Sequence, residues 1–346
     1  MIFADAIRML VDKKSLTRKE AGEVMEQIMQ GQATPVQIAA FLTALRMKGE
    51  TVDEIAGSAE AMRAAAIPVH HDLKLVVDTC GTGGDGQGSF NISTAAAFVV
   101  AGAGFHVAKH GNRSVSSRSG SADLLEAVGI PIETTAAVAA ACLKDIGLAF
   151  LYAPAFHPAT KAATPVRREL GIRTIFNVLG PLTNPARPDV QLIGVYEESW
   201  VRTIAEVLVA MGCEEGLVVH GDGHDEIVLS GTTLVAEITG GQVCMRTWKP
   251  ADFGLAPHKA ASLSGGTADE NAKILMQILE GQPGVFREAV CVNAAALIRA
   301  ATRLGQKKTM TLKEAYQAAT ESIDRKQALG KLETLKDALK SAKAKP

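Results

Sequence analysis

Between residues 73 and 103 an apolar run, a glycine-rich loop and a helical segment follow one another directly, and this order constrains the fold more than any other feature. Residues 73–77 predict a buried strand, residues 78–86 read Asp-Thr-Cys-Gly-Thr-Gly-Gly-Asp-Gly, and residues 92–103 predict a helix. Such an order begins a βαβ unit, whose strands pair in a parallel sheet. The sequence therefore predicts an α/β fold.

The same alternation continues along the chain, so we expect a central, mostly parallel sheet covered by helices. Residues 226–248 alternate like a hairpin, with a turn at Gly240-Gly241. Further strands are predicted at 106–108, 148–152, 190–196 and 216–220, and helices at 121–128, 135–145, 200–211, 268–279, 287–304, 312–323 and 331–346.

The first 66 residues differ, because they read as helices throughout. A bundle of about 65 residues is thin for an independent core, so we expect it to pack against another segment or another subunit. Residues 154–189, a Pro- and Gly-rich insert with a helix at 161–170, interrupt the α/β alternation and could rejoin these helices. Three capping boxes mark the helix starts: Thr17 with Glu20, Thr34 with Gln37, and Thr51 with Glu54.

Composition excludes several classes of protein. The 346 residues include 36 Lys+Arg and 37 Asp+Glu, a net charge of −1, which argues against a polybasic nucleic-acid binder or a membrane-surface protein but not against a local basic site. Five scattered cysteines without a C-x-x-C pair predict reduced thiols in the cytoplasm. The N-terminus reads as a helix rather than a signal peptide, and no apolar run reaches about 18 residues, so we expect no membrane span.

The glycine-rich loop has the features of an anion site. Glycines turn backbone N–H groups toward a ligand, and the start of the following helix adds its dipole. The spacing of Gly81, Gly83 and Gly86 also fits a dinucleotide fingerprint, but the next strand ends in Lys109-His110, which suits a phosphate rather than a ribose diol. The alternative is a tight structural turn. Polar side chains beyond the needs of a turn favour the anion site: Asp85, Asn91, Ser93 and Thr94.

A second cradle of the same kind is predicted on the neighbouring strand. Lys109-His-Gly-Asn-Arg113 is followed by a Ser/Gly-rich stretch, 114–123, that ends in a helix. Both loops would lie at the carboxyl ends of their strands, where open α/β sheets bind ligands. The alternative is a flexible polar loop.

Residues 220–226 read His-Gly-Asp-Gly-His-Asp-Glu and offer a metal site. The adjacent carboxylates Asp225 and Glu226 suit Mg²⁺, which bridges carboxylates to substrate phosphates. Zinc lacks a third His or Cys ligand nearby, and the remaining alternative is a solvated acidic turn. Arg167 could bind a carboxylate bidentately, although an arbitrary arginine is more often a surface cation, and His157 could equally be a structural histidine.

Together these motifs resemble the anthranilate phosphoribosyltransferase family. The resemblance runs in order from the helical N-terminus to at least residue 300. It rests on Asp-Thr-Cys-Gly-Thr-Gly-Gly-Asp, Asn-Ile-Ser-Thr, Lys-His-Gly-Asn-Arg, Ser-Gly-Ser-Ala-Asp-Leu-Leu-Glu-Ala, Phe-His-Pro, Arg-Thr-Ile-Phe-Asn-Val-Leu-Gly-Pro-Leu-Thr-Asn-Pro and His-Gly-Asp-Gly-x-Asp-Glu. His224 and Val128 depart from the pattern at positions without a proposed role.

The resemblance implies transfer of phosphoribose from phosphoribosyl pyrophosphate (PRPP) to the amine of anthranilate, in tryptophan biosynthesis. By similarity, PRPP would be held by Gly81, Thr82, Gly83, Gly84, Asp85, Asn91, Ser93, Thr94, Lys109 and Ser121. Anthranilate would contact Gly81, His110, Asn112, His157 and Arg167, and Arg168 is the alternative to Arg167 as the ligand of its carboxylate. Mg²⁺, two ions per site, would be held by Ser93, Asp225 and Glu226, and Lys109 and Arg167 would be the catalytic residues.

The resemblance also implies an architecture: a helical domain of residues 1–66 and 155–189 on a larger α/β domain of residues 67–154 and 190–346. A homodimer through the helical domain is expected, with anthranilate synthase as a possible further partner and neither nucleic acid nor membrane as one. Two alternatives stay open: an enzyme like pyrimidine nucleoside phosphorylase, which would use free phosphate without Mg²⁺, and a non-enzymatic paralogue of this fold that binds nucleic acid.

Overall fold

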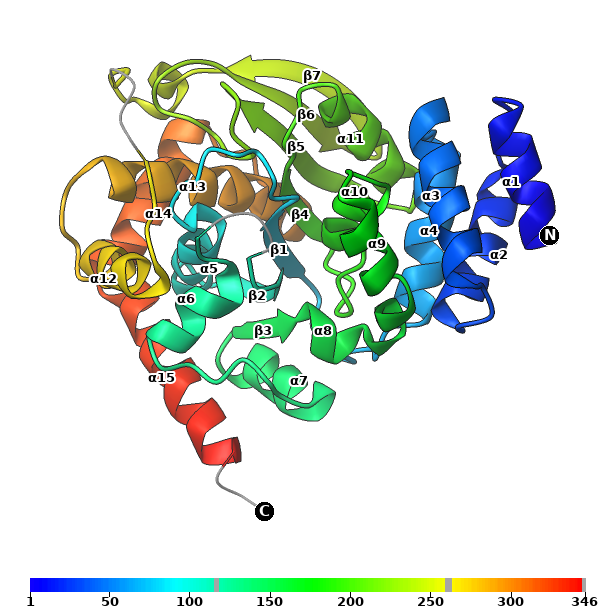
Figure 1. Cartoon of the computed structure of the whole chain (residues 1–346). Coiled ribbons are helices and arrows are strands. Elements are labelled where there is room, and N and C mark those ends of the chain that lie inside the picture. Colours follow the sequence, from blue (N-terminus) through cyan, green and yellow to red (C-terminus); the bar gives the residue numbers. More distant parts are fainter. Residues whose placement is uncertain (115–117, 259–262, 344–346) are drawn as a thin grey trace.

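The structure is a computed structural model that describes residues 1–114, 118–258 and 263–343. Residues 1–66 form the helices α1 (Phe3–Val11), α2 (Arg18–Met29), α3 (Pro35–Lys48) and α4 (Val52–Ala64), which lie together at one end of the molecule (Figure 1). Thr17, Thr34 and Thr51 form the three predicted capping boxes. Each threonine hydroxyl accepts a backbone N–H three residues further on, which fixes where the helix begins.

Within the described ranges, seven strands form one sheet in the order β3-β2-β1-β4-β5-β6-β7. Neighbours from β3 to β5 pair in parallel, whereas β6 and β7 are added as an antiparallel hairpin, so the predicted sheet is confirmed. Gly240 and Gly241 form the hairpin turn, both at positive φ. The strands are β1 (Val76–Gly81), β2 (His106–Gly111), β3 (Leu148–Tyr152), β4 (Val190–Gly194), β5 (Glu215–Gly221), β6 (Thr233–Thr239) and β7 (Gln242–Trp248).

The strand predicted at 73–77 lies further along the chain, at Val76–Gly81, so the prediction that it stops before Asp78 is wrong. Asp78 is fully buried within the strand. Its Oδ2 accepts a hydrogen bond from Asn184 Nδ2 at 2.8 Å and its Oδ1 accepts one from His110 N at 3.3 Å. These hydrogen bonds replace those that water would make with the carboxyl group. The strand can therefore continue through Asp78, although an aspartate after an apolar run usually indicates the end of a strand.

Helices cover both faces of the sheet, because successive strand residues point to opposite sides. Leu192 packs in one hydrophobic core and the next residue, Ile193, packs in the other. The first core contains residues of α5 (Ile92–Gly102), α6 (Ser121–Ala127), α7 (Ala136–Asp145), α12 (Ala268–Leu279), α13 (Val285–Gln306), α14 (Leu312–Asp324) and α15 (Gln327–Lys343).

The second core joins the N-terminal helices, the insert and α11 (Trp200–Ala210). Val166 and Leu179 of the insert share this core with Phe41 and Leu42 of α3. Figure 1 shows the insert helices Thr164–Leu170 and Phe176–Leu182 beside α3 and α4. The insert contains α8 (Ala153–Phe156), η1 (Pro158–Ala162), α9 (Thr164–Leu170) and α10 (Phe176–Leu182), and a last short helix, η2 (Pro250–Phe253), follows β7.

Among the described residues, no helix combines the length and the apolar character that a membrane span requires.

Candidate active site

The order in which the chain adds strands reverses between β1 and β4, although the two strands are parallel. The chain leaves β1 into α5 on one face, and leaves β4 into α11 on the other face. Loops therefore diverge at the carboxyl ends of these two central strands, and open α/β sheets bind ligands in the crevice outside such ends. The glycine-rich loop that follows β1 begins there.

The glycine-rich loop takes backbone conformations that other residues rarely adopt. Gly83, Gly84, Gly86 and Gly88 have φ between +62° and +77°. The loop is anchored through Thr82, whose N–H donates to Gly194 O at 2.9 Å and whose hydroxyl accepts from Tyr196 N at 3.1 Å. Anchored glycines of this kind present backbone N–H groups to an anion.

The acidic loop after β5 crosses above β4 and meets the glycine-rich loop. Gly83 N donates to Asp225 Oδ2 at 2.8 Å, across 142 positions in the sequence. Gly194, at the end of β4, permits this crossing, because a Cβ built there would lie 1.6 Å from Asp225 O. A Cβ on Gly81 would lie 2.4 Å from Asp225 Oδ2. Two glycines thus bring the predicted phosphate loop and the predicted metal pair into one site.

The carboxyl groups of Asp225 and Glu226 are buried close to another carboxylate, and this raises their pKa values. Burial and the neighbouring Asp85 carboxylate raise the pKa of Asp225 to about 6. Burial and then Asp225 raise the pKa of Glu226 well above its usual range, against the opposing effects of Lys109 and of the Ser93 N–H at the start of α5. A divalent cation would relieve this crowding, and oxygen donors are the ones Mg²⁺ prefers.

The described side chains do not enclose a metal ion by themselves. Among the described residues, no group of three His, Cys, Asp or Glu side chains is arranged to hold a metal ion. Mg²⁺ commonly binds through one or two carboxylates and completes its shell with water and substrate phosphates. The chain therefore fits Mg²⁺ that binds together with a phosphate ligand.

Lys109 places a buried cation on the other side of the glycine-rich loop. Its side chain is 3% exposed, and Nζ donates to Thr79 O at 2.8 Å and to His110 O at 3.3 Å. An ammonium has three N–H donors, so one is left for a ligand. Burial raises the pKa of Asp78 to about 6 even though the Lys109 charge acts to lower it.

Two neutral histidines lie side by side. The ring centroids of His110 and His157 are 5.2 Å apart. Burial, with the His157 ring next, lowers the pKa of His110 to about 3, and burial lowers the pKa of His157 to about 4. Within the described chain, Nε2 of each ring has no hydrogen-bond partner. The pair offers an apolar wall with two unused nitrogens, and neither ring is charged at neutral pH.

The predicted polar residues at the helix starts are held in different ways. Asn91 Oδ1 accepts from Asn271 Nδ2 at 2.9 Å, and its Nδ2 donates to Ser119 O at 3.0 Å. The Thr94 hydroxyl is buried, with no partner among the described residues. Asn112 is exposed beside the start of α6, where a Cβ on Gly111 would meet Ser121 Oγ at 3.2 Å. Part of the predicted second anion loop, 115–117, lies outside the described residues.

The predicted arginine ligands differ in their burial and in whether they already form ion pairs within the protein. Arg167 is half-buried, with its guanidinium 4.9 Å from the Phe176 ring centre, whereas Arg168 is exposed. This difference favours Arg167 as the arginine that binds a carboxylate in the site. Burial lowers the pKa of Arg167. Arg113, predicted as an anion ligand, pairs instead with Asp123 at 2.9 Å and Glu126 at 2.6 Å, so its charge is balanced within the protein.

The sequence prediction missed Arg173. This insert residue donates from Nη2 to Gly84 O, and its guanidinium lies 4.0 Å from the centre of the Tyr196 ring. It is a direct tie between the insert and the glycine-rich loop. Its position in the Arg-Thr-Ile-Phe-Asn motif was the available signal, but nothing in that motif points to Gly84.

Comparisons with known proteins agree with this geometry. Residues 73–329 match the model described as the glycosyl transferase family a/b domain, and residues 4–66 match its helical bundle domain. An anthranilate phosphoribosyltransferase from Anaeromyxobacter sp. (strain Fw109-5) is 50% identical over 95% of this chain and 96% of its own length. The crystal structure of the enzyme of that name from Thermus thermophilus is 42% identical, with a TM-score of 0.91, over 97% of this chain and 99% of that one.

A more distant structure carries ligands. The anthranilate phosphoribosyltransferase from Saccharomyces cerevisiae, in complex with PRPP and Mg, is 29% identical with a TM-score of 0.89, over 98% of each chain.

Proposed function

The chain belongs to the anthranilate phosphoribosyltransferase family, and from this membership we propose that the crevice described above transfers the 5-phosphoribosyl group of PRPP to the amine of anthranilate. The products are N-(5-phosphoribosyl)anthranilate and pyrophosphate, in tryptophan biosynthesis. The observation that carries this is the hydrogen bond from Gly83 N to Asp225 Oδ2, because it joins a phosphate cradle to a carboxylate pair in one crevice.

The glycine-rich loop and its neighbours hold PRPP in this proposal. Backbone N–H groups of residues 81–85, the start of α5 and the buried Lys109 ammonium surround the place for the pyrophosphate. The C1′–O bond breaks early and leaves an oxocarbenium-like ribosyl centre, as in glycoside cleavage. Lys109 and the loop donors stabilise the charge that develops on the departing oxygen. The PRPP set is Gly81, Thr82, Gly83, Gly84, Asp85, Asn91, Ser93, Thr94, Lys109 and Ser121.

Anthranilate lies on the insert side of the crevice. The Arg167 guanidinium pairs with its carboxylate, and Asn112 and Gly81 bound the ring from the α/β side. His110 and His157 line its approach. The aryl amine is already neutral at pH 7, so the protein orients it in line with C1′ and no general base is required.

Ser93, Asp225 and Glu226 are the residues that would hold Mg²⁺, which the yeast relative binds with PRPP. When bound, Mg²⁺ supplies charge neutralisation to the pyrophosphate. We propose two ions per site, and phosphate oxygens and water would complete the coordination shell of each.

Loss of anthranilate fluorescence on addition of PRPP tests this function. The expected result is a PRPP-dependent loss that requires Mg²⁺. Fluorescence that stays constant with both ligands present would refute the assignment. Phosphorolysis of a pyrimidine nucleoside without Mg²⁺, or salt-sensitive binding of DNA or RNA in place of turnover, would favour one of the two alternatives.

The affinity for Mg²⁺ should fall in mild acid. Since the pKa of Asp225 is about 6, this group is ionised at pH 7.5 and mostly protonated at pH 5.5, and protonation competes with the metal. We expect the half-saturating Mg²⁺ concentration at pH 5.5 to be roughly fourfold higher from Asp225 alone, and higher still with Glu226. Activity titrations with Mg²⁺ at fixed saturating PRPP measure this. An unchanged half-saturation value across these pH values would contradict it.

Removal of the Arg173 side chain should weaken PRPP binding selectively. A charge-assisted hydrogen bond is worth about 1.5–3 kcal/mol, so the KM for PRPP of R173A should rise roughly tenfold or more. The KM for anthranilate should change little, and R173K should recover part of the loss. The control is R202A, which removes an exposed arginine of α11. Equal increases in both KM values would contradict a role centred on the glycine-rich loop.

We propose a homodimer through the helical domain. Large apolar side chains are exposed on two helices that pack together, α1 and α3: Ile2 just before α1, Val11, Val36 and Met47. Light scattering should give twice the monomer mass for the wild type and the monomer mass for V36E/M47E. A dimer that survives both charged substitutions would place the interface elsewhere.

The domain division and the compartment complete the proposal. Residues 1–66 and 155–189 form the helical domain and residues 67–154 and 190–346 form the α/β domain, which the shared core of Phe41 and Leu179 supports. All five cysteines are free thiols, which supports the cytoplasm as the compartment.

A further inference from the structure

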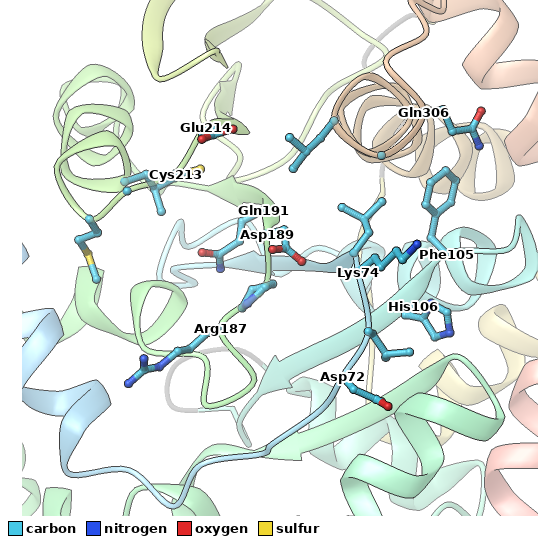
Figure 2. A pocket seen from close by; sticks show the side chains of 18 of the residues that line it. Asp72, Lys74, Phe105, His106, Arg187, Asp189, Gln191, Cys213, Glu214 and Gln306 are labelled. Carbon is cyan, nitrogen blue, oxygen red and sulfur yellow. The ribbon is translucent and has the colours of Figure 1, made fainter.

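A large cavity lies at the amino ends of the central strands, whereas the glycine-rich loop lies at their carboxyl ends. Its volume is about 1100 Å³, and it is bounded by the turns that precede β2, β4 and β5, represented by Phe105, Asp189 and Glu214 (Figure 2). Two of the three segments that connect the helical domain to the sheet contribute to it, through Lys74 and Arg187. The volume suffices for a small organic ligand, and junctions of this kind are common ligand sites. None of the residues assigned to PRPP or anthranilate lines it.

Two arginines that line this cavity, Arg63 and Arg187, form no ion pair with a carboxylate of the described residues. Arg63, at the end of α4, donates from Nε to Leu182 O at 2.6 Å. Burial, and then the nearby charge of Arg187, lower the pKa of Arg63 to about 10. Within the described part of the chain, neither guanidinium forms an ion pair with a carboxylate. A desolvated cation beside a second cation is costly, and an anion between the two would relieve that cost.

The other lining groups limit the charge of that anion. Three carboxyl groups line the cavity: Asp189, whose Oδ2 accepts from Val76 N at 2.8 Å, Asp72, whose Oδ2 lies 3.7 Å from Lys144 Nζ, and Glu214. These carboxylates would repel a polyanion such as a nucleotide. Apolar side chains, including Leu75 and Leu208, line the space between the charged groups.

We propose that this cavity binds a small organic monocarboxylate, whose carboxylate lies between Arg63 and Arg187 and whose apolar body packs against Leu75 and Leu208. A guanidinium matches a carboxylate with two parallel hydrogen bonds. Such a ligand links α4 to the segment that enters β4. This site is independent of the proposed transferase reaction, because it shares no residue with the crevice at the carboxyl ends of the strands.

Cys213 is a reporter inside the cavity. Its half-buried thiol lines the same wall, and burial raises its pKa to about 11, while the Arg63 charge acts in the opposite direction. Iodoacetate carries a carboxylate and iodoacetamide is its neutral counterpart. In both reactions the thiol proton goes to solvent, the Sγ–CH₂ bond forms and the carbon–iodine bond breaks, with iodide leaving. Cys244, exposed on β7, provides an internal reference in the same molecule.

The test compares the two reagents at the two cysteines by peptide mass spectrometry. We expect the ratio of iodoacetate to iodoacetamide rates at Cys213 to exceed the ratio at Cys244 by about tenfold, which corresponds to one charge-assisted pair. Arg187→Gln, at an exposed position, should remove this excess without lowering the thermal midpoint. Millimolar benzoate should slow iodoacetamide at Cys213 and leave Cys244 unaffected.

Equal ratios at the two cysteines, or an excess that persists in R187Q, would overturn the proposal, as would the absence of protection by benzoate. None of these measurements uses PRPP, anthranilate or turnover. A failure here is therefore distinguishable from a failure of the transferase assignment, which the fluorescence assay reports.

Discussion

The double variant D225N/E226Q should lose about a thousandfold in kcat/KM and yet unfold at an unchanged or higher temperature. The amides keep the shape of the loop, and the new amide oxygen at position 225 could still accept the hydrogen bond from Gly83 N, but the two negative charges that would hold Mg²⁺ are removed. Burial raises the pKa of both carboxyl groups, so the folded protein without metal disfavours their ionised forms. Neutral amides remove that cost. Anthranilate fluorescence and thermal unfolding measure the two effects.

A matched control lies in the same loop. Asp222 is an exposed acidic residue near the pair, so D222N changes the charge by one unit without entering the crevice. Its turnover should match the wild type. Activity of the double variant close to the wild-type value at limiting Mg²⁺ would refute the metal assignment, and a large drop in its unfolding temperature would show that the pair stabilises the fold instead.

Replacement of Lys109 by methionine should be nearly as damaging to turnover, and it should also change how stability depends on pH. Methionine fills the buried space but removes the only charge of the side chain, so kcat/KM should fall by about a thousandfold. Lys109 acts to lower the pKa of both Asp78 and Glu226. Without it, both pKa values rise further.

The sign of the pH effect follows from those raised values. A carboxyl group whose pKa is higher in the folded state than in the unfolded state contributes stability below its unfolded pKa, and this contribution is lost as the pH rises through the folded value. For Asp78, whose pKa is about 6 in the wild type, that window spans roughly pH 4–6, and in K109M its upper limit rises while its lower limit, the unfolded pKa, stays the same. The free energy of unfolding of K109M should therefore fall more steeply between pH 5.5 and pH 8 than that of the wild type.

Urea unfolding at pH 5.5 and pH 8 measures this difference. K144M, which removes an exposed lysine from α7, is the control and should follow the wild-type profile. Parallel profiles for K109M and the wild type would mean that Lys109 does not balance the buried carboxyl groups.

The features that could be predicted from the sequence are those that depend on a few adjacent residues. A threonine followed three residues later by Glu or Gln caps its own helix, so Thr17, Thr34 and Thr51 behave as expected. The glycine-rich loop and the pair Asp225-Glu226 were likewise visible as chemistry, because glycine conformations and carboxylate donors are properties of a few adjacent residues.

What escaped prediction depends on residues far apart in the chain. The hydrogen bond between Gly83 and Asp225 requires that residue 194, on the strand between them, has no side chain. No local sequence pattern shows this. Asp78 continues a strand because Asn184, from the insert, satisfies its carboxylate. Arg113 forms ion pairs with Asp123 and Glu126 of α6, which the pattern around Arg113 does not show.

The placement of the insert also affects how the protein is made. The apolar face of α3, including Phe41 and Leu42, shares its core with Phe176 and Leu179, which are synthesised more than a hundred residues later. At about 5–20 residues per second, the ribosome delivers those partners roughly ten seconds after α3. The nascent chain therefore carries an uncovered apolar surface through that interval, and we expect chaperone dependence to concentrate there, before the sheet is complete.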